Sequence, residues 1–187
     1  MRTAVVAVAA CLVLAGCGSG KADMWAEVEV PKKVTDTEDC FPVGVVDVPA
    51  DWTPINLGPR GESLRFGLKA ECDITSDHAA GVVKVYQGSR LESDTGERLT
   101  DREVLEAYLE VQDASDVEIR EAKVGRAGGF EAVWRTNGKP NRAFTYTVYG
   151  GSHTMLVAAL GAPDDKFEET VLPVYLLARK SAQDSGP

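Results

Sequence analysis

The chain has 187 residues, of which 44% are hydrophobic, which is the length and composition of one folded domain rather than of a disordered chain. Its formal net charge is −9 and no basic block is present. This excludes the classes of protein that hold nucleic acid, or an anionic membrane by charge alone, with clustered Lys and Arg.

The first sixteen residues have the pattern of an export signal. Arg2 supplies a positive start, and Ala4 to Leu14 is an uncharged run of eleven residues. That run is shorter than the roughly 20 residues that a membrane-spanning helix needs, and it has the length of the apolar region of a signal peptide. Residues 1–16 are therefore predicted to be a signal peptide.

The apolar run ends in Leu14, Ala15, Gly16 and Cys17, a stretch that resembles the lipobox of bacterial lipoproteins. The resemblance implies that a diacylglyceryl group is attached to the Cys17 thiol and that the chain is cut before Cys17. Two acyl chains on one residue anchor a protein durably. The expected location is the extracytoplasmic face of the plasma membrane, with the membrane as a partner through Cys17. The alternative is an ordinary secreted protein in which Cys17 has no special role.

Four cysteines are present, Cys11, Cys17, Cys40 and Cys72. Once Cys11 leaves with the signal peptide and Cys17 carries lipid, two remain, and thiols of an exported protein are expected to pair. The prediction is a Cys40–Cys72 disulfide that closes a loop of about 33 residues and contributes roughly 3–4 kcal/mol to stability. A metal site or a catalytic thiol is less favoured, because there is no CxxC pair and no nearby set of histidines.

The rest of the chain is expected to form three parts. A lipidated tether covers residues 17–39, a folded domain covers 40–181, and a polar tail covers 182–187. The tether begins with flexible glycine and serine residues. Residues 24–30 are left open between a strand and part of a flexible tether. Within them, residues 27–30 suit either a short edge strand or a segment that lies on the domain.

Three strands are predicted in the first half of the domain. Residues 43–48 are rich in valine and end before Pro49, residues 63–69 alternate between apolar and polar side chains, and residues 82–87 form another β-branched run. Trp52 is expected to close the turn after Pro49 onto the core.

A helix is predicted to follow these strands. Thr100 and Glu103 have the spacing of a capping box, in which Thr100 is the N-cap. The apolar face of the helix is expected to be Val104, Leu105, Tyr108 and Leu109. The helix is expected to end near Asp113.

Four further strands are predicted over residues 117–124, 129–136, 142–149 and 153–160. Turns rich in glycine and asparagine separate them, so an antiparallel meander is expected. A last helix begins after Pro163, and Pro173 is expected to kink or split it. Its buried face is predicted to be Phe167, Val171, Leu172 and Tyr175.

This order of elements indicates an α+β domain: an antiparallel sheet of about six to seven strands with two main helices. The domain resembles the PsbP-like fold and actinobacterial lipoproteins of the LpqN type, over roughly residues 40–180. The resemblance is carried by the turn Val48–Trp52, the hairpins at 129–136 and 142–160, and the closing helix from Pro163, while Pro173 departs from it. Cystatin-like and NTF2-like folds are the alternatives.

No catalytic site, metal site or cofactor is predicted. The two histidines are His78 and His153, and Ser152, His153 and Asp77 are the only residues considered for a catalytic triad. Adjacent residues of a strand point to opposite faces, so Ser152 and His153 are expected to be badly placed as nucleophile and base. The acidic residues after Pro163 are expected to stabilise the start of the last helix.

The remaining candidates for a binding site are aromatic residues that either form core or line a cleft between sheet and helix. They are Trp52, Tyr86, Trp134, Tyr146 and Tyr149. The predicted function is a non-enzymatic, lipid-anchored module of the cell envelope that binds a protein partner or a small or lipidic ligand. The alternative is a hydrolase that acts on envelope material.

Overall fold

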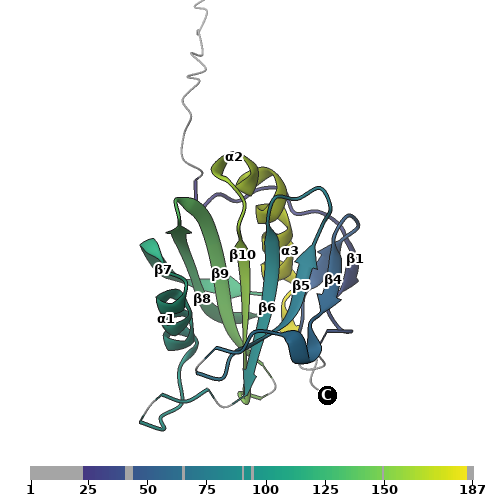
Figure 1. Cartoon of the computed structure of the whole chain (residues 1–187). Coiled ribbons are helices and arrows are strands. Elements are labelled where there is room, and N and C mark those ends of the chain that lie inside the picture. The colour runs from purple at the N-terminus through teal and green to yellow at the C-terminus, as the bar shows by residue number, and fades with distance from the viewer. Residues whose placement is uncertain are drawn as a thin grey trace, which may run out of the picture.

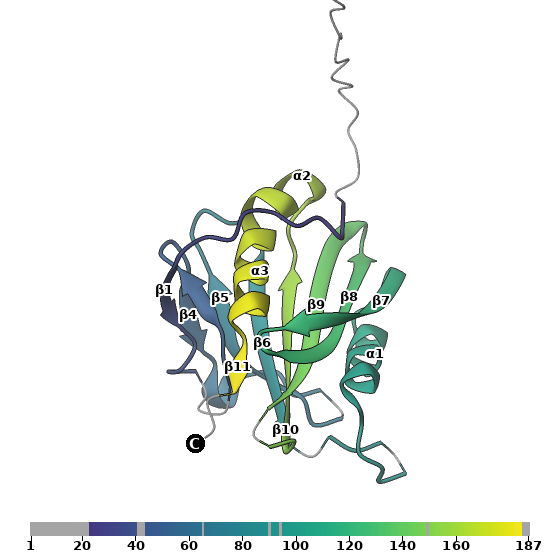
Figure 2. The same cartoon turned by 180° about the vertical axis from the view of Figure 1, so that it is seen from behind.

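The computed structural model describes residues 23–40, 44–64, 66–89, 91–93, 95–148 and 150–184. Its main sheet consists of β4 (Thr53–Asn56), β5 (Lys69–Thr75), β6 (Val82–Ser89), β7 (Ser115–Val124), β8 (Ala127–Thr136), β9 (Lys139–Val148) and β10 (His153–Leu160). These seven strands are antiparallel, in the order β4-β5-β6-β10-β9-β8-β7. Helix α1 (Asp101–Val111) covers one face, and α3 (Leu172–Ser181) covers the other (Figures 1 and 2). The predicted α+β class is confirmed.

The four consecutive strands predicted for the second half are confirmed as β7 to β10. Between β8 and β9, Asn137 and Gly138 both have positive φ angles, 51° and 77°, as a two-residue hairpin turn requires. Alternation then divides the side chains: Trp134 of β8 packs toward α1, while Phe144 and Tyr146 of β9 pack toward α3. The sheet therefore separates two apolar clusters.

Helix α1 begins with the predicted capping box. The backbone N–H of Glu103 donates to Oγ1 of Thr100 at 3.3 Å, and the N–H of Thr100 donates to Oε2 of Glu103 at 2.8 Å. The four apolar residues predicted for its inner face are all buried. Tyr108 meets Tyr86 and Trp134 edge to face, so α1 is packed on the sheet by aromatic contacts.

The last helix is divided at Pro173, as predicted. It consists of α2 (Asp164–Lys166), the π-helical turn η2 (Phe167–Val171) and α3. Pro173 has no N–H for the α-helical bond to the residue four positions earlier, and Leu172 donates instead to the carbonyl of Phe167, five positions earlier. The turn is widened there, but the predicted residues of the inner face stay buried.

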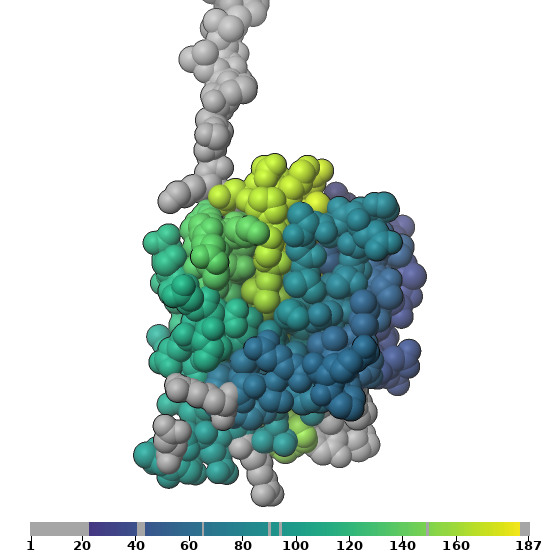
Figure 3. Space-filling view, viewed as in Figure 1, coloured from purple at the N-terminus to yellow at the C-terminus, as the bar shows by residue number. Residues whose placement is uncertain are grey.

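The prediction of a strand over residues 63–69 is wrong. Gly67 has a φ of 89°, which turns the chain, and Ser63 pairs with Lys69 only as an isolated bridge before β5. The apolar residues of this stretch still pack into the cluster on the α1 side. Together with η1 (Gly58–Arg60) they cover the lower part of that sheet face, in blue in Figure 3.

The strand predicted over residues 43–48 is two short strands, β2 (Gly44–Val45) and β3 (Asp47–Pro49), and residue 43 lies outside the described part. Strand β3 pairs with β1 (Lys33–Asp36), which falls in the stretch assigned above to the tether. Strand β2 pairs with β11 (Gln183–Asp184), which falls in the stretch assigned to the tail. Both stretches therefore contribute to the folded unit.

Residues 23–32, which we call the N-terminal segment, contain no helix or strand and lie on the domain. Ala26, Val28 and Val30 pack against the cluster on the α3 side, while Glu27 and Glu29 between them are exposed. Figure 2 shows the segment, in purple, crossing in front of α3. Residues 24–30 are therefore neither a strand nor a tether detached from the domain, and residues 27–30 are the segment that lies on the domain.

Candidate functional site

Three neighbouring strands place charged side chains on the sheet face beneath α3. Phe130, Ala132 and Trp134 of β8 face α1, so alternation sends Glu131 to the α3 side. Arg142 of β9 shares its face with Phe144, and Arg120 of β7 lies opposite Glu131 in the register of β7 and β8. The result is a glutamate between two arginines in the middle of a sheet face.

Glu131 is completely buried and is surrounded by donors. Arg142 Nε donates to its Oε1 at 2.8 Å, Arg179 Nη1 of α3 donates to both its oxygens at 2.8 and 2.9 Å, and Arg120 Nη2 donates to Oε2 at 3.0 Å. The Tyr175 hydroxyl also donates to Oε1, at 2.9 Å. We call Arg120, Glu131, Arg142 and Arg179 the arginine site.

The charges of the site shift the acid–base equilibria of its members. Burial favours the protonated form of Glu131, but the hydrogen bond and charge of Arg142, together with Arg179 and Arg120, outweigh burial and lower the pKa of Glu131. Burial raises the pKa of Tyr175 well above its ordinary value, and the nearby charge of Glu131 raises it further. Glu131 is therefore ionised and Tyr175 neutral at physiological pH.

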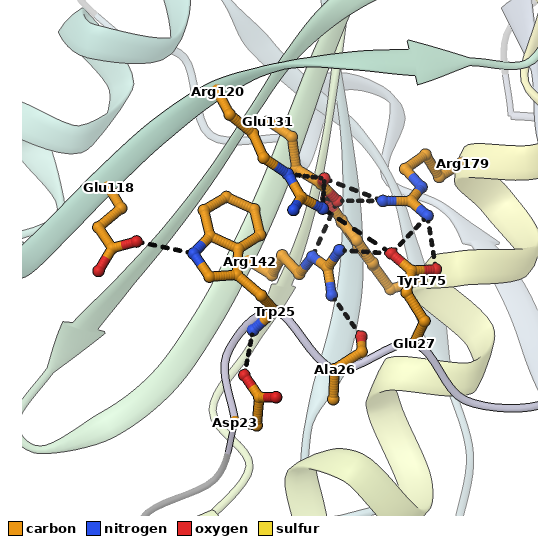
Figure 4. Close-up of polar contacts among 10 residues, drawn as sticks. All are labelled: Asp23, Trp25, Ala26, Glu27, Glu118, Arg120, Glu131, Arg142, Tyr175 and Arg179. Carbon is orange, nitrogen blue, oxygen red and sulfur yellow. Dashed lines mark hydrogen bonds and ion pairs between the residues drawn. The ribbon is translucent and has the colours of Figure 1, made fainter.

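The N-terminal segment covers the arginine site (Figure 4). The ring of Trp25 lies 3.8 Å from the guanidinium carbon of Arg120, and its Nε1–H donates to Glu118 at 2.8 Å. The carbonyl of Ala26 accepts from Arg142 Nη1 at 2.8 Å. The next residue, Glu27, supplies a second carboxylate.

Two arginines donate hydrogen bonds to Glu27, and Arg120 forms a longer ion pair with its Oε1 at 3.8 Å. Its Oε1 accepts from Arg142 Nη2 at 3.0 Å, and both its oxygens accept from Arg179 Nη2 at 2.8 Å. The Glu27 side chain is 56% exposed, whereas that of Arg142 is completely buried. An exposed carboxylate on an extended segment is thus a main partner of a buried cation.

A surface cavity of about 310 Å³ opens beside Glu27. It is lined by Glu27, Val30, Lys123, Gly125, Leu176, Arg179 and Lys180. Three cations and one acid surround this space, although the whole chain has a net charge of −9. A larger hollow of about 730 Å³ lies at the β7–β8 turn, but it is lined by two acids, Asp101 and Glu121, as well as by two bases, Lys123 and Arg126. The arginine site and the cavity beside Glu27 together form the candidate site, which is suited to an anion.

The aromatic residues considered for a cleft do not share one. Trp52 and Tyr146 belong to the apolar cluster on the α3 side, whereas Tyr86 and Trp134 belong to the cluster on the α1 side. All four are buried, and Tyr149 lies outside the described residues. The sheet stands between the two pairs, so these four side chains are core.

The predicted Cys40–Cys72 disulfide is confirmed, with the two Cα atoms 5.6 Å apart. It joins the stretch after β1 to the middle of β5. The lipobox residues Leu14, Ala15, Gly16 and Cys17 lie outside the described part of the chain. Within the described residues, no helix is long and apolar enough to cross a membrane.

Ser152 and His153 were expected to point to opposite faces of a strand and so to be badly placed as nucleophile and base, but the two side chains are in contact. Ser152 Oγ lies 2.9 Å from His153 Nδ1. Ser152 belongs to the turn before β10, where the alternation of a strand does not apply. Asp77, the third residue considered for a triad, precedes β6, whereas His153 pairs with Ser89 at the other end of that strand. The three residues are not brought together.

Three of the acidic residues after Pro163 have partners, of which only that of Glu169 lies in the same helix. Asp164 pairs with Arg135 at 2.9 Å, Glu169 pairs with Lys166 at 2.7 Å, and Glu168 accepts from the N–H of Asp23 at 2.9 Å. In the ranges that the structure describes, no group of three or more His, Cys, Asp or Glu side chains is placed to hold a metal ion.

Sequence reasoning did not single out the arginine site. A signal was present, because Arg142 lies in phase with Phe144 and Tyr146, and Glu131 lies within the otherwise apolar run Phe130–Trp134. A charge on the buried face of a strand indicates a partner on the neighbouring strand. The contribution of Glu27 and Arg179 carried no such signal, since both come from elements far away in the sequence.

Comparisons with known proteins give three results. A family described as “Uncharacterised lipoprotein” matches residues 28–182. Among solved structures, the chain is similar to the crystal structure of LpqN, involved in cell envelope biogenesis of Mycobacterium tuberculosis. The identity is 16% and the TM-score 0.52, over 83% of this chain and 90% of that chain, so the likeness shows a shared fold and confirms the resemblance to LpqN. No curated protein matches the chain.

Proposed function

The chain belongs to this family of uncharacterised lipoproteins, and from that premise we propose that it is anchored in the plasma membrane by a diacylglyceryl group on Cys17. The stretch Leu14–Cys17 at the end of an apolar run supports this assignment. The proposed location of the domain is the extracytoplasmic face of that membrane.

We further propose that the domain is a non-catalytic binding or accessory module of the cell envelope. The observation that carries this proposal is the arginine site, where Arg142 and Arg179 hold a carboxylate beside a cavity of about 310 Å³. Convergent charged donors beside a pocket are typical of a ligand site. The similarity to LpqN, which is described as involved in envelope biogenesis, agrees with a role in the envelope.

Metabolic labelling with a palmitate analogue tests the anchor. The wild-type protein is expected to carry label in the membrane fraction, and Cys17→Ala is expected to carry none. Cys11→Ala is the matched control, because Cys11 would leave with the signal peptide and the label should persist. Label that persists in Cys17→Ala, or that is lost in Cys11→Ala, would contradict attachment at Cys17.

Crosslinking in intact cells tests the binding role. A photoreactive amino acid in place of Lys123, on the rim of the cavity, is expected to capture the ligand or partner. The control is the same replacement at Arg102, which is about half exposed on α1, on the other side of the sheet. Equal crosslinking at both positions, or none at Lys123, would argue against a binding module at this site.

A second candidate function is hydrolysis, favoured by the contact of 2.9 Å between Ser152 and His153. A serine-directed fluorophosphonate probe separates the two functions. Under the proposed binding role the wild-type protein stays unlabelled. Labelling that disappears in Ser152→Ala would instead favour an envelope hydrolase.

A further inference from the structure

We propose that the arginine site binds a phosphate group in exchange for the carboxylate of Glu27, so that the N-terminal segment and the ligand compete for Arg142 and Arg179. This inference rests on the proposed binding function and names the chemistry of its ligand. It is argued from the partners of the two arginines, from the segment that supplies Glu27, and from the neighbouring cavity.

The buried Arg142 depends on the N-terminal segment for most of its partners. Its Nε donates to Glu131, but its Nη1 donates to the carbonyl of Ala26 and its Nη2 donates to Glu27. A guanidinium without partners inside a protein is strongly unfavourable. If the segment lifts, Arg142 keeps only Glu131 as a hydrogen-bond partner among the described residues, and an anion in the place of Glu27 would restore the lost partners.

The N-terminal segment is suited to such an exchange. It has no backbone ladder to a strand. The hydrogen bonds of its first half to the rest of the domain come from the side chains of Trp25 and Glu27, the N–H of Asp23 and the carbonyl of Ala26. The Glu27 side chain is more than half exposed, so a soluble anion can approach the same guanidinium groups. Displacement of Glu27 breaks its ion pairs with Arg120, Arg142 and Arg179 and leaves the disulfide and the sheet intact.

The charge of the site favours phosphate over a single carboxylate. Without Glu27, three arginines face one glutamate, which leaves two positive charges for the ligand to balance. Lys123 and Lys180 add positive charge along the cavity wall. Arginine binds the oxygens of phosphate through strong, charge-assisted hydrogen bonds. Nη2 of Arg179 and Nη2 of Arg142 now donate to the oxygens of Glu27 and would be free to donate to phosphate.

The cavity gives room for what the phosphate is attached to. Its volume of about 310 Å³ is at the lower end of the range for small-molecule sites. Val30 and Leu176 supply apolar wall on either side of the charged groups. The phosphate therefore belongs either to a free phosphorylated molecule or to the headgroup of a phospholipid, and the test separates these sources.

Calorimetric titration with inorganic phosphate tests the exchange. The protein is the full chain from residue 17 onward with Cys17→Ala, so that no acyl chain contributes. Glu27→Gln removes the competing charge and is expected to bind phosphate about fivefold more tightly than the parent, the factor for loss of an ion pair. Arg179→Gln is expected to lose phosphate binding.

Glu29→Gln is the matched control for charge. Glu29 lies two residues further along the same segment, is exposed, and makes no hydrogen bond or ion pair with any residue that the structure describes. The Glu29→Gln variant should bind phosphate with the same affinity as the parent. Equal affinities of Glu27→Gln and Glu29→Gln, or binding that survives in Arg179→Gln, would overturn the exchange.

Vesicles of phosphatidylcholine with and without phosphatidylglycerol identify the source of the phosphate. Tighter binding of Glu27→Gln than of Glu29→Gln to the phosphatidylglycerol vesicles supports the exchange with a lipid headgroup as ligand. Phosphate binding without that difference supports the exchange with a free ligand. Absence of phosphate binding by Glu27→Gln overturns the inference alone, because palmitate labelling and crosslinking test the anchor and the module separately.

Discussion

Arg142 donates from Nε to Oε1 of Glu131 at 2.8 Å, and neither side chain has any exposed surface. A buried ion pair is stable only when further partners satisfy both charges. Here Arg179, Arg120 and Tyr175 complete the partners of Glu131, and the N-terminal segment completes those of Arg142. The pair therefore links the stability of the sheet to the position of the segment.

Glu131→Gln should lower the free energy of unfolding by about 3–5 kcal/mol, because it leaves three arginines around a neutral amide. Urea denaturation at pH 7 measures the change. Glu121→Gln is the control, since Glu121 is an exposed acid on β7 with the same charge. A similar loss in both variants would show that total charge, and not the buried contact, is responsible.

The stability of the wild-type protein should fall as the solution becomes acidic, in a way that Glu131→Gln does not. The surrounding arginines hold the pKa of Glu131 below its unfolded value of about 4.3. The stabilisation from Glu131 is therefore fully present above that value and is lost as the pH falls through the folded pKa. Denaturation curves between pH 7 and pH 3 should show the two proteins converging in stability below pH ~4. If the difference in free energy of unfolding between the two proteins stayed constant across this range, it would contradict the lowered pKa of Glu131.

Much of the fold could be predicted because its signals are local. The capping box at Thr100 and Glu103 starts α1, and the Asn137–Gly138 turn defines the β8–β9 hairpin. The stretch 63–69 shows the limit of such signals. Its alternation does mark the residues that pack together, but Gly67 reverses the chain before a strand can form.

Gly125→Ala should destabilise the domain by about 3 kcal/mol or more. Gly125 has a φ of 54°, its N–H donates to the carbonyl of Arg179 at 2.8 Å, and a methyl group there would overlap the carbonyl oxygen of Ala182. Gly138→Ala is the control: its φ of 77° is also positive, but the added carbon would meet no described atom within 4 Å. Thermal unfolding should show a larger loss of stability in Gly125→Ala than in Gly138→Ala. Equal losses would mean that the positive φ alone, and not the overlap with Ala182, destabilises the variant.

Replacement of Cys40 and Cys72 together by alanine should lower the free energy of unfolding by about 3–4 kcal/mol. The sequence separation of the pair is 32, and the cross-link restricts the unfolded chain over that loop. Chemical denaturation of the oxidised wild type and of the double variant measures the difference. Non-reducing peptide mapping should recover the two cysteines joined, and two free thiols in exported protein would contradict the bond.

Thr100→Ala should cost about 1 kcal/mol, because the N–H of Glu103 would lose its acceptor at the start of α1. Thr100→Ser keeps the hydroxyl and should retain most of the stability. Thermal unfolding of the two variants checks this. Equal destabilisation by serine and alanine would place the effect in packing of the threonine methyl group and not in the cap.

The candidate site was harder to predict than the fold, because its parts come from distant stretches. Alternation in β8 and β9 places Glu131 and Arg142 on one face, but Glu27 is separated from Arg179 by 152 residues. Only packing of α3 and of the N-terminal segment brings these two together. The predicted aromatic cleft was wrong for a different reason. Large apolar side chains are found both in cores and in pockets, so their presence in the sequence does not distinguish the two. In the structure the sheet separates these residues into two clusters.

The course of the N-terminal segment over α3 also sets how far the domain can reach. The segment is held from Asp23 onward, where its N–H meets Glu168 of η2. Five residues lie between Cys17 and Asp23, and even a fully extended chain spans only about 20 Å over the six steps from one Cα atom to the next. With lipid on Cys17, this short linker would keep the η2 end of the domain close to the bilayer. Whatever the domain binds would then have to come to the membrane surface.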